Sequence, residues 1–96
     1  MALFISLCNW TDQGFKSVKG TTDRAKAAKQ AAAKQGVKIK EILYTVGQYD
    51  FVVICDAPDA ETLSRFMLGT AVQGNVRTMT MRAFSVDEMK GILSQI

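Results

Sequence analysis

The chain has 96 residues, of which 48% are hydrophobic and one is proline, which is typical of one small globular domain and too short for two. It contains no apolar stretch of the roughly 18 residues that span a bilayer, and no basic leader with a small-residue cleavage site. We therefore expect a single domain over residues 1–96, located in the cytoplasm and without membrane contact. There is no histidine, and the two cysteines, Cys8 and Cys55, fit free buried thiols, so we expect no metal and no cofactor.

The net charge of +3 conceals an uneven distribution along the chain. Residues 1–40 carry eight basic and two acidic side chains, whereas residues 41–96 carry four basic and seven acidic ones. The basic residues are separated by alanine rather than by aromatic side chains that could stack on bases. We interpret them as the solvated face of a helix. Nucleic-acid binding is not expected, because no DNA-reading helix or zinc pattern accompanies them.

The first third of the chain predicts a strand, a loop and a helix. Residues 2–9 are almost continuously apolar and predict a strand, and residues 10–20 predict a loop. Residues 21–36 predict a helix that begins with threonine, is rich in alanine, and ends at Gly36 in a left-handed conformation. Its predicted buried stripe consists of alanine methyl groups, which let a helix lie close to a sheet.

The middle of the chain predicts two strands joined by a turn. In residues 37–46 the apolar alternation slips by one residue, which indicates a strand with a β-bulge near Lys40 and Glu41. Residues 51–56 are apolar on both alternating sets, a pattern typical of a central strand that is covered on both faces.

The last third predicts a helix, a strand and a terminal helix. Residues 57–74 have helical periodicity, with Asp59 as the N-cap, and residues 75–84 alternate as a strand. Residues 85–96 begin with a serine and glutamate at capping-box spacing and continue as a short amphipathic helix.

The predicted order is β-α-β-β-α-β-α, and its first six elements match the split βαβ pattern of ferredoxin-like folds. Two right-handed crossovers, each leaving a gap for a strand of the other, give the strand order 4-1-3-2. The sequence therefore predicts an α+β fold, a ferredoxin-like βαββαβ sandwich with an extra C-terminal helix.

This topology leaves one face of the sheet without helices. Four strands of six residues make a surface of about 400 Å², close to the largest apolar patch that a monomer tolerates. If half of it is apolar and becomes buried, the gain is on the order of 5 kcal/mol per chain. We therefore expect a homodimer packed sheet against sheet around a two-fold axis, or a larger assembly built from it.

Three loops meet at one edge of the predicted sheet, namely those after the first strand, between the second and third strands, and before the fourth. They combine aromatic, acidic, basic and amide side chains, a mixture that small-ligand clefts use. The candidate ligand-binding residues at this edge are Asn9, Trp10, Gly47, Tyr49, Asp50, Asn75 and Arg77, with Thr11 beside them.

The Gly-Gln-Tyr-Asp segment also has a purely structural interpretation. Gly47 can supply the positive φ of a tight hairpin, Asp50 can accept backbone N–H groups that close the turn, and Tyr49 can pack over the next strand. Trp10 can be a core or interface aromatic instead of a stacking surface, and Arg77 can pair with Asp50 or with a neighbouring chain. A turn alone, and a turn that also contacts a ligand or partner, both remain open.

The segments CNWTDQG, VGQYDFVVICDAPD and GNVRTMTMRAF together resemble the GYD domain proteins, small bacterial and archaeal proteins named after a Gly-x-Tyr-Asp motif. The resemblance extends along nearly the whole chain, with Gln48 at the variable position. It implies a dimeric α/β barrel built from ferredoxin-like halves. The family has no established activity, so the resemblance adds no catalytic residues.

Residues 46–82 are also similar to the effector domain of the feast/famine (Lrp/AsnC) transcription regulators, with a Gly-x-Tyr-Asp turn, a Pro-Asp helix start and a Val-x-Thr-x-Thr-like strand. In those proteins the turn lines amino-acid sites between dimers. The similarity implies a ligand role for Gly47, Tyr49 and Asp50.

Two functional hypotheses follow. The first is a homo-oligomeric module that binds or senses a small molecule at the Gly-x-Tyr-Asp edge. The alternative is a dimeric-barrel enzyme with a cavity between sheet and helices, in which Asp50 is the base and Arg77 holds an anion.

Overall fold

In a computed structural model that describes all residues from Met1 to Ile96, the chain folds into one four-stranded sheet with four α-helices. The strands are β1 (Ala2–Trp10), β2 (Lys38–Tyr44), β3 (Phe51–Ala57) and β4 (Val76–Ala83). The helices are α1 (Asp12–Lys16), α2 (Thr21–Lys34), α3 (Ala60–Val72) and α4 (Val86–Leu93), and a 3-10 turn, η1 (Val18–Gly20), precedes α2.

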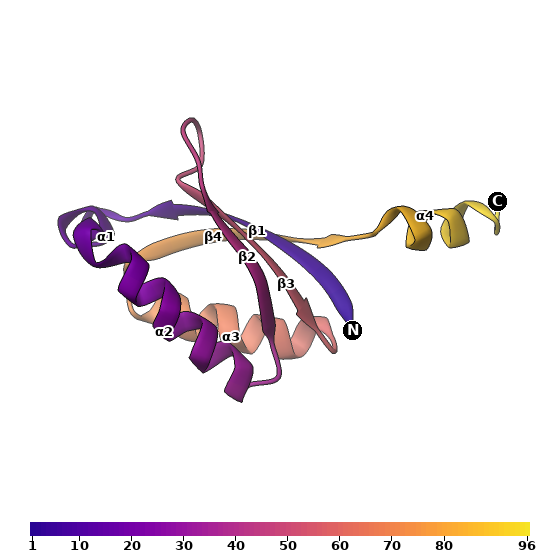
Figure 1. The fold of residues 1–96 in the computed structure, drawn as a ribbon, viewed down its shortest axis with the longest axis horizontal. Helices are drawn as coiled ribbons and strands as arrows, with labels where there is room; N and C mark the ends of the chain where they lie inside the picture. The colour runs from indigo at the N-terminus through magenta and orange to yellow at the C-terminus, as the bar shows by residue number, and fades with distance from the viewer.

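The strands lie in the order β2-β3-β1-β4, and all neighbours are antiparallel (Figure 1). This confirms the strand order 4-1-3-2 predicted from the element order. The long helices α2 and α3 lie on the same side of the sheet, and no helix covers its other side (Figure 1). We call the side toward α2 and α3 the covered face and the other side the open face.

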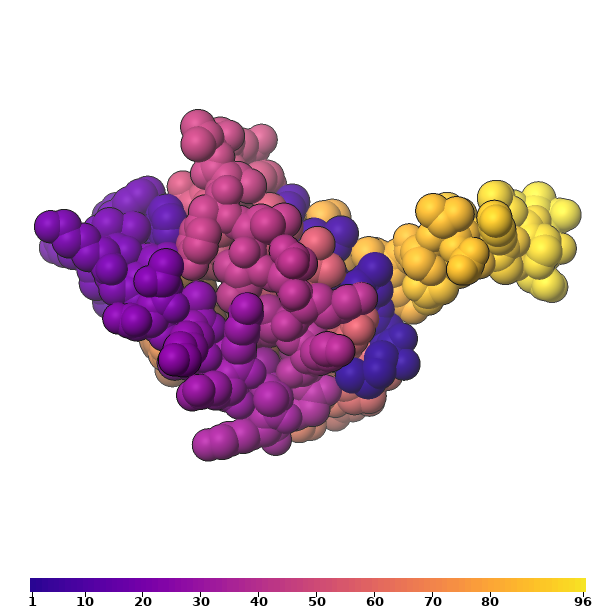
Figure 2. Space-filling model, in the orientation of Figure 1, coloured from indigo at the N-terminus to yellow at the C-terminus, as the bar shows by residue number.

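Helix α4 does not join the two covering helices. It continues outward from the end of β4 and projects from the body of the molecule, as the yellow segment in Figure 2 shows. All residues from 84 to 96 are exposed. No helix in the structure is both long enough and apolar enough to cross a membrane.

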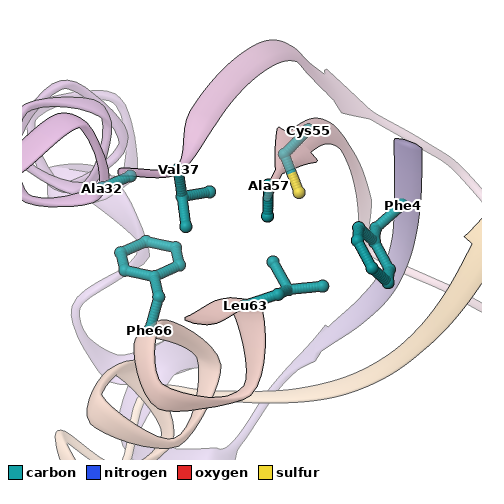
Figure 3. Packing of buried hydrophobic residues seen from close by; sticks show 7 residues of the cluster. All are labelled: Phe4, Ala32, Val37, Cys55, Ala57, Leu63 and Phe66. Carbon is teal, nitrogen blue, oxygen red and sulfur yellow. The ribbon is translucent and has the colours of Figure 1, made fainter. Parts of the chain in front are cut away.

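The core lies between the covered face and the two long helices. Seven buried side chains form it, contributed by β1, β3, α2, α3 and the segment before β2 (Figure 3). They are Phe4, Ala32, Val37, Cys55, Ala57, Leu63 and Phe66. Ser6 is also fully buried on this face, where its hydroxyl forms a 2.8 Å hydrogen bond with Thr80 of β4.

Most of the predicted local signals are present in the structure. The pairing of β2 with β3 shifts between Ile39 and Glu41, which confirms the bulge, and Gly36 has a φ of 82°. Asp59 caps α3 by accepting the Thr62 N–H, and the capping box at the start of α4 is complete. Strand β2 ends at Tyr44, two residues earlier than predicted.

The prediction of a loop over residues 10–20 is wrong, because this segment contains α1 and η1. Thr11 is the N-cap of α1 and accepts the Gly14 N–H, so a polar stretch that resembles a turn in sequence starts a helix instead. Gly14 is buried against the backbone of Asn75, where a Cβ would lie 2.1 Å from the Asn75 carbonyl oxygen. The close approach of two backbones therefore explains this glycine.

Candidate functional site

The sheet divides the predicted site residues between its two faces. Along β1, Cys8 is buried on the covered face and Asn9 points to the open face, because side chains alternate along a strand. Asn9 pairs with Arg77, so Arg77 also lies on the open face. Trp10 and Asn75 instead line a cavity on the covered side. The loops meet at one edge as predicted, but the side chains do not converge on one point.

Asp50 fastens the Gly-x-Tyr-Asp turn to β1. Its carboxylate accepts the backbone N–H of Trp10 at 2.9 Å, and its own N–H donates to the carbonyl of Cys8 at 2.9 Å. Its carbonyl accepts the Thr45 N–H across the hairpin. Gly47 has a φ of 141°, a conformation that favours glycine, and no atom lies within 4 Å of where its Cβ would be. These contacts match the structural interpretation of the segment.

Tyr49 and Arg77 lie toward the open face. The Tyr49 hydroxyl is 3.9 Å from the sulfur of Met79, which pairs with Leu7 on that face. Arg77 is exposed and forms no ion pair with Asp50; the two ion pairs in the structure are Lys40–Asp56 and Arg82–Glu88. The suggested pairing of Arg77 with Asp50 is therefore wrong, because the Asp50 carboxylate turns to the backbone of β1.

A cavity of about 380 Å³ lies between the covered face, α2 and α3. Its wall at the Gly-x-Tyr-Asp end is aromatic. The ring of Trp10 stacks on Tyr44, with centroids 6.4 Å apart and an interplanar angle of 19°, and lies 5.6 Å from Phe51. Phe66 of α3 adds a fourth aromatic side chain to the wall. Such a mainly apolar hollow with a few polar groups is typical of small-molecule sites.

Helix α2 leaves this space open because its inward side consists of alanine. Ala25, Ala28 and Ala31 line the cavity, whereas Ala32 packs into the core. The methyl stripe predicted from the sequence therefore has two roles: near its end the helix packs tightly against the core, and elsewhere the small side chains leave a hollow that larger ones would fill.

Arg24 is the one charged side chain in the cavity wall. Its guanidinium donates to the carbonyl of Ser17 at 2.8 Å and to the hydroxyl of Thr21 at 3.1 Å. No carboxylate pairs with it. A guanidinium offers five N–H donors in a fixed plane, so donors remain for an anionic group in the cavity.

The Cys8 thiol also lines the cavity, but it is not a nucleophile at neutral pH. Burial, followed by the nearby Cys55, raises the pKa of Cys8 from 9.0 to about 12. The thiol donates weakly to the carbonyl of Ser6 at 3.7 Å. Burial likewise raises the pKa of Cys55. Both cysteines are free, as predicted, and both are held as neutral thiols.

Hydrogen bonds from Thr11 and α1 to the segment before β4 shape one end of the cavity. The side-chain amide of Gln13 donates to the Gln73 carbonyl at 2.9 Å and to the Asn75 side chain at 3.0 Å. The Thr11 N–H donates to the Asn75 carbonyl at 3.0 Å. These bonds hold Asn75 and Gln73 at the cavity wall.

Sequence reasoning missed Arg24, Tyr44, Phe51 and Phe66 as cavity residues. Two signals were available: alanines on the inward stripe of a helix that faces large aromatics, and an arginine among lysines on that helix. Neither is specific without the backbone, because the same pattern also fits a tightly packed helix with a solvated basic face.

The sequence model described as "GYD domain" matches residues 4–93. A protein of Thermus thermophilus named "Glutamine synthetase and cystathionine beta-lyase binding protein" is 36% identical over 90 residues, which cover 93% of this chain and 95% of that protein. The crystal structure of TTHA0845, also from Thermus thermophilus, superposes with a TM-score of 0.56 and 23% sequence identity, covering 90% of this chain and 96% of that one. The last similarity concerns the fold.

Proposed function

This chain belongs to the GYD domain family, and from its geometry we propose that it is a homodimeric module that binds a small molecule in the cavity between the sheet, α2 and α3. The single observation that carries the proposal is that cavity of about 380 Å³, with an aromatic wall and one unpaired guanidinium. Its volume lies within the range of about 300–1,000 Å³ that is usual for small-ligand sites.

The ligand class that fits best is a small organic acid with an aromatic or aliphatic body. Trp10 and Tyr44 offer flat apolar surfaces, and Arg24 offers donors to a carboxylate. The amides of Gln73 and Asn75 can bind a second polar group of the ligand.

Binding is favoured over catalysis by the chemistry of the wall. It contains no carboxylate, and the Cys8 thiol is neutral at physiological pH. The enzyme alternative took Asp50 as the base, but its carboxylate accepts the Trp10 N–H and does not line the cavity. An acid–base mechanism would therefore need a proton acceptor supplied by the ligand itself.

In this proposal the Gly-x-Tyr-Asp motif holds part of the cavity wall in place and does not itself contact the ligand. Asp50 fixes the backbone of Trp10, which forms part of the cavity wall, and Gly47 permits the turn that brings Asp50 there. Tyr49 extends to the open face, where Asn9 and Arg77 also lie, so we assign these three residues to contacts between copies. Ligand contacts are assigned to Trp10 and Asn75 among the predicted residues.

The homodimer is supported by the apolar character of the open face. Eight large apolar side chains gather there, from all four strands: Leu3, Ile5, Leu7, Leu43, Val52, Ile54, Met79 and Met81. Leu43, Met79 and Met81 are each between 44% and 55% exposed. A contiguous patch of this kind indicates an interaction surface, and a second copy packed sheet against sheet covers it with matching chemistry. Two buried neutral thiols fit a reducing compartment such as the cytoplasm.

Fluorescence of Trp10, the only tryptophan, provides the direct test. We expect at least one acid from a panel of amino acids and aromatic and branched aliphatic carboxylates to change this emission and to raise the melting temperature. A ligand at 100 times its dissociation constant stabilises the folded state by about 2.7 kcal/mol. If no acid in the panel changes either signal, the proposal is wrong.

Two variants connect such a signal to the cavity. Arg24→Gln removes the charge and should weaken the binding of an acid by about ten- to hundredfold, with Lys26→Gln on the same helix as the control. Ala28→Leu fills the hollow and should abolish binding, whereas Ala33→Leu on the exposed side of α2 should not. Equal effects of either variant and its control would place the ligand elsewhere.

A second candidate function is the binding of larger proteins. It is favoured by the name of the 36% identical relative, a binding protein for glutamine synthetase and cystathionine β-lyase. Sedimentation of this protein with each of those enzymes tests it: co-sedimentation at micromolar concentration supports the candidate, and independent sedimentation of all components contradicts it.

A further inference from the structure

Residues 84–96 form an arm that extends beyond the sheet (Figures 1 and 2). Helical spacing puts four apolar side chains of α4 on one side of it, Val86, Met89, Ile92 and Leu93, and Ile96 follows after the helix ends. They are between 42% and 97% exposed. Asp87, Gly91 and Ser94 occupy the opposite side. A stripe of this kind on a helix normally faces a packed surface.

The arm is held in its direction by contacts at its base. The Arg82 guanidinium lies 4.5 Å from the centre of the Phe84 ring and pairs with Glu88 at 3.4 Å. It also donates to the carbonyls of Leu3, at 3.3 Å, and Ala83. Ser85 and Glu88 form the capping box. The arm is therefore oriented outward by several interactions, although an eight-residue helix is marginal in water without packing.

The area of the open face indicates what the arm packs against. The four strands average about eight residues. At about 3.3 Å per residue and about 4.8 Å between strands, the open face therefore covers about 500 Å² on each copy, or about 1,000 Å² on two copies. Stable specific interfaces bury about 1,200–2,000 Å². Sheet contact alone therefore falls short of that range, and additional apolar surface has to come from elements beside the sheet.

We propose that the arm of each copy docks on the second copy of this chain, so that two sheets and two exchanged arms hold the dimer together. This inference rests on the proposed sheet-to-sheet dimer. Met79 and Met81 belong to the open face, and the arm leaves the end of the same strand. The arm therefore starts at the end of a strand that contributes to the proposed interface, and a two-fold axis makes each arm contact the other copy in the same way.

Sedimentation velocity over a dilution series measures the effect of the arm on assembly. Leu93→Asp puts a charge on the apolar stripe and should raise the dimer dissociation constant by about tenfold or more. Ser94→Asp is the control, because it adds the same charge one residue later, on the polar side of the arm. It should leave the dimer dissociation constant within about twofold of the wild-type value.

The outcomes separate the arm from the dimer itself. A wild-type chain that is monomeric at all concentrations overturns both the dimer and the arm exchange. A wild-type dimer with the same dissociation constant in Leu93→Asp overturns the arm exchange alone. A tenfold loss shared by Leu93→Asp and Ser94→Asp also overturns it, because the effect would then not depend on the stripe.

A second measurement locates the arm directly and does not depend on a disruptive variant. Cys8 and Cys55 are each 1% exposed, so in a Gln95→Cys variant a thiol-reactive nitroxide reagent should label only the cysteine at position 95. Copies with this label are mixed with isotope-labelled copies that lack it, so that only effects between copies are observed. We expect broadening of amide signals on the isotope-labelled copy. If no amide broadens in a mixed dimer, the arm does not dock on the second copy and is free for a different protein.

Discussion

The covered and open faces of the sheet are built by the same four strands, yet only one of them is completed within the chain. On the covered face Phe4, Cys8 and Cys55 are buried beneath α2 and α3, whereas on the open face Met79 is 55% exposed. The difference arises from strand alternation: residues one position apart enter opposite surfaces. Both sets are largely apolar, but the chain provides helices to cover only one of them.

The two faces also differ in how closely they are filled. The covered face combines a tight core around Leu63 and Val37 with a hollow beside the alanine side of α2. No helix lies over the open face (Figure 1). In our proposals, a small ligand therefore belongs to the covered face and a second copy to the open one.

Leu63→Ala should have the largest effect on the stability of the chain itself. Leu63 is 3% exposed in the core, and truncating a buried leucine costs about 2–5 kcal/mol through lost contacts and a residual cavity. Urea unfolding should show this loss at every protein concentration. Leu43→Ala on the open face is the control, since its effect should grow only at concentrations where dimers form. If Leu63→Ala and Leu43→Ala lower the free energy of unfolding equally at every protein concentration, the two faces do not differ in this way.

Met81→Lys should have the next largest effect, on assembly. A lysine on the open face places a charge in the proposed interface and should raise the dimer dissociation constant by about tenfold or more. The unfolding free energy of the monomer should change by at most about 0.5 kcal/mol, because Met81 is exposed in the single chain. Sedimentation and urea unfolding measure the two quantities separately. A dimer that tolerates this lysine would place the interface on another surface.

The sequence predicted the fold well because its elements have strong local signals. The Ser85 capping box, Asp59, Gly36 and the phase slip near Glu41 each depend on neighbouring residues, so they could be recognised without knowing the fold. The strand order followed from connection rules that hold for most βαβ units. Helix α1 was missed because its stability depends on distant contacts, such as that between Gly14 and Asn75.

The candidate site was harder to predict for a physical reason. The order of the loops placed Asn9, Trp10, Tyr49 and Arg77 at one edge of the sheet, as the structure has them. Side chains alternate along a strand, however, so Asn9 and Trp10 lie on opposite faces of the sheet. The cavity depends on the volume that α2 leaves unfilled, which is a property of packing between distant elements rather than of any motif.

Asp50→Ala tests the link between the Gly-x-Tyr-Asp turn and the covered face. Loss of the carboxylate leaves the Trp10 N–H without its acceptor and should cost about 1–2 kcal/mol. The emission of Trp10 should shift to longer wavelength as the ring becomes more exposed. Asp50→Asn keeps an acceptor oxygen and should fall between Asp50→Ala and the wild type in both measurements. If Asp50→Ala leaves both unchanged, the carboxylate does not position Trp10.

The last prediction concerns the thiols of the covered face, whose ionisation should lower the free energy of unfolding at alkaline pH and leave it unaffected at neutral pH. The pKa of Cys8 is about 12 in the folded chain, against 9.0 for an exposed thiol, so the folded state retains a proton that the unfolded state loses. This contribution to stability is complete below about pH 9 and is lost as the pH rises toward about 12, by up to about 1.4 kcal/mol per pH unit for one thiol. In urea unfolding from about pH 7 to about pH 11, the wild type should therefore lose more stability than Cys8→Ala, and Cys8→Ala more than Cys8→Ala/Cys55→Ala. If the unfolding free energy of all three proteins falls equally with pH, burial on the covered face does not raise the pKa values of these thiols.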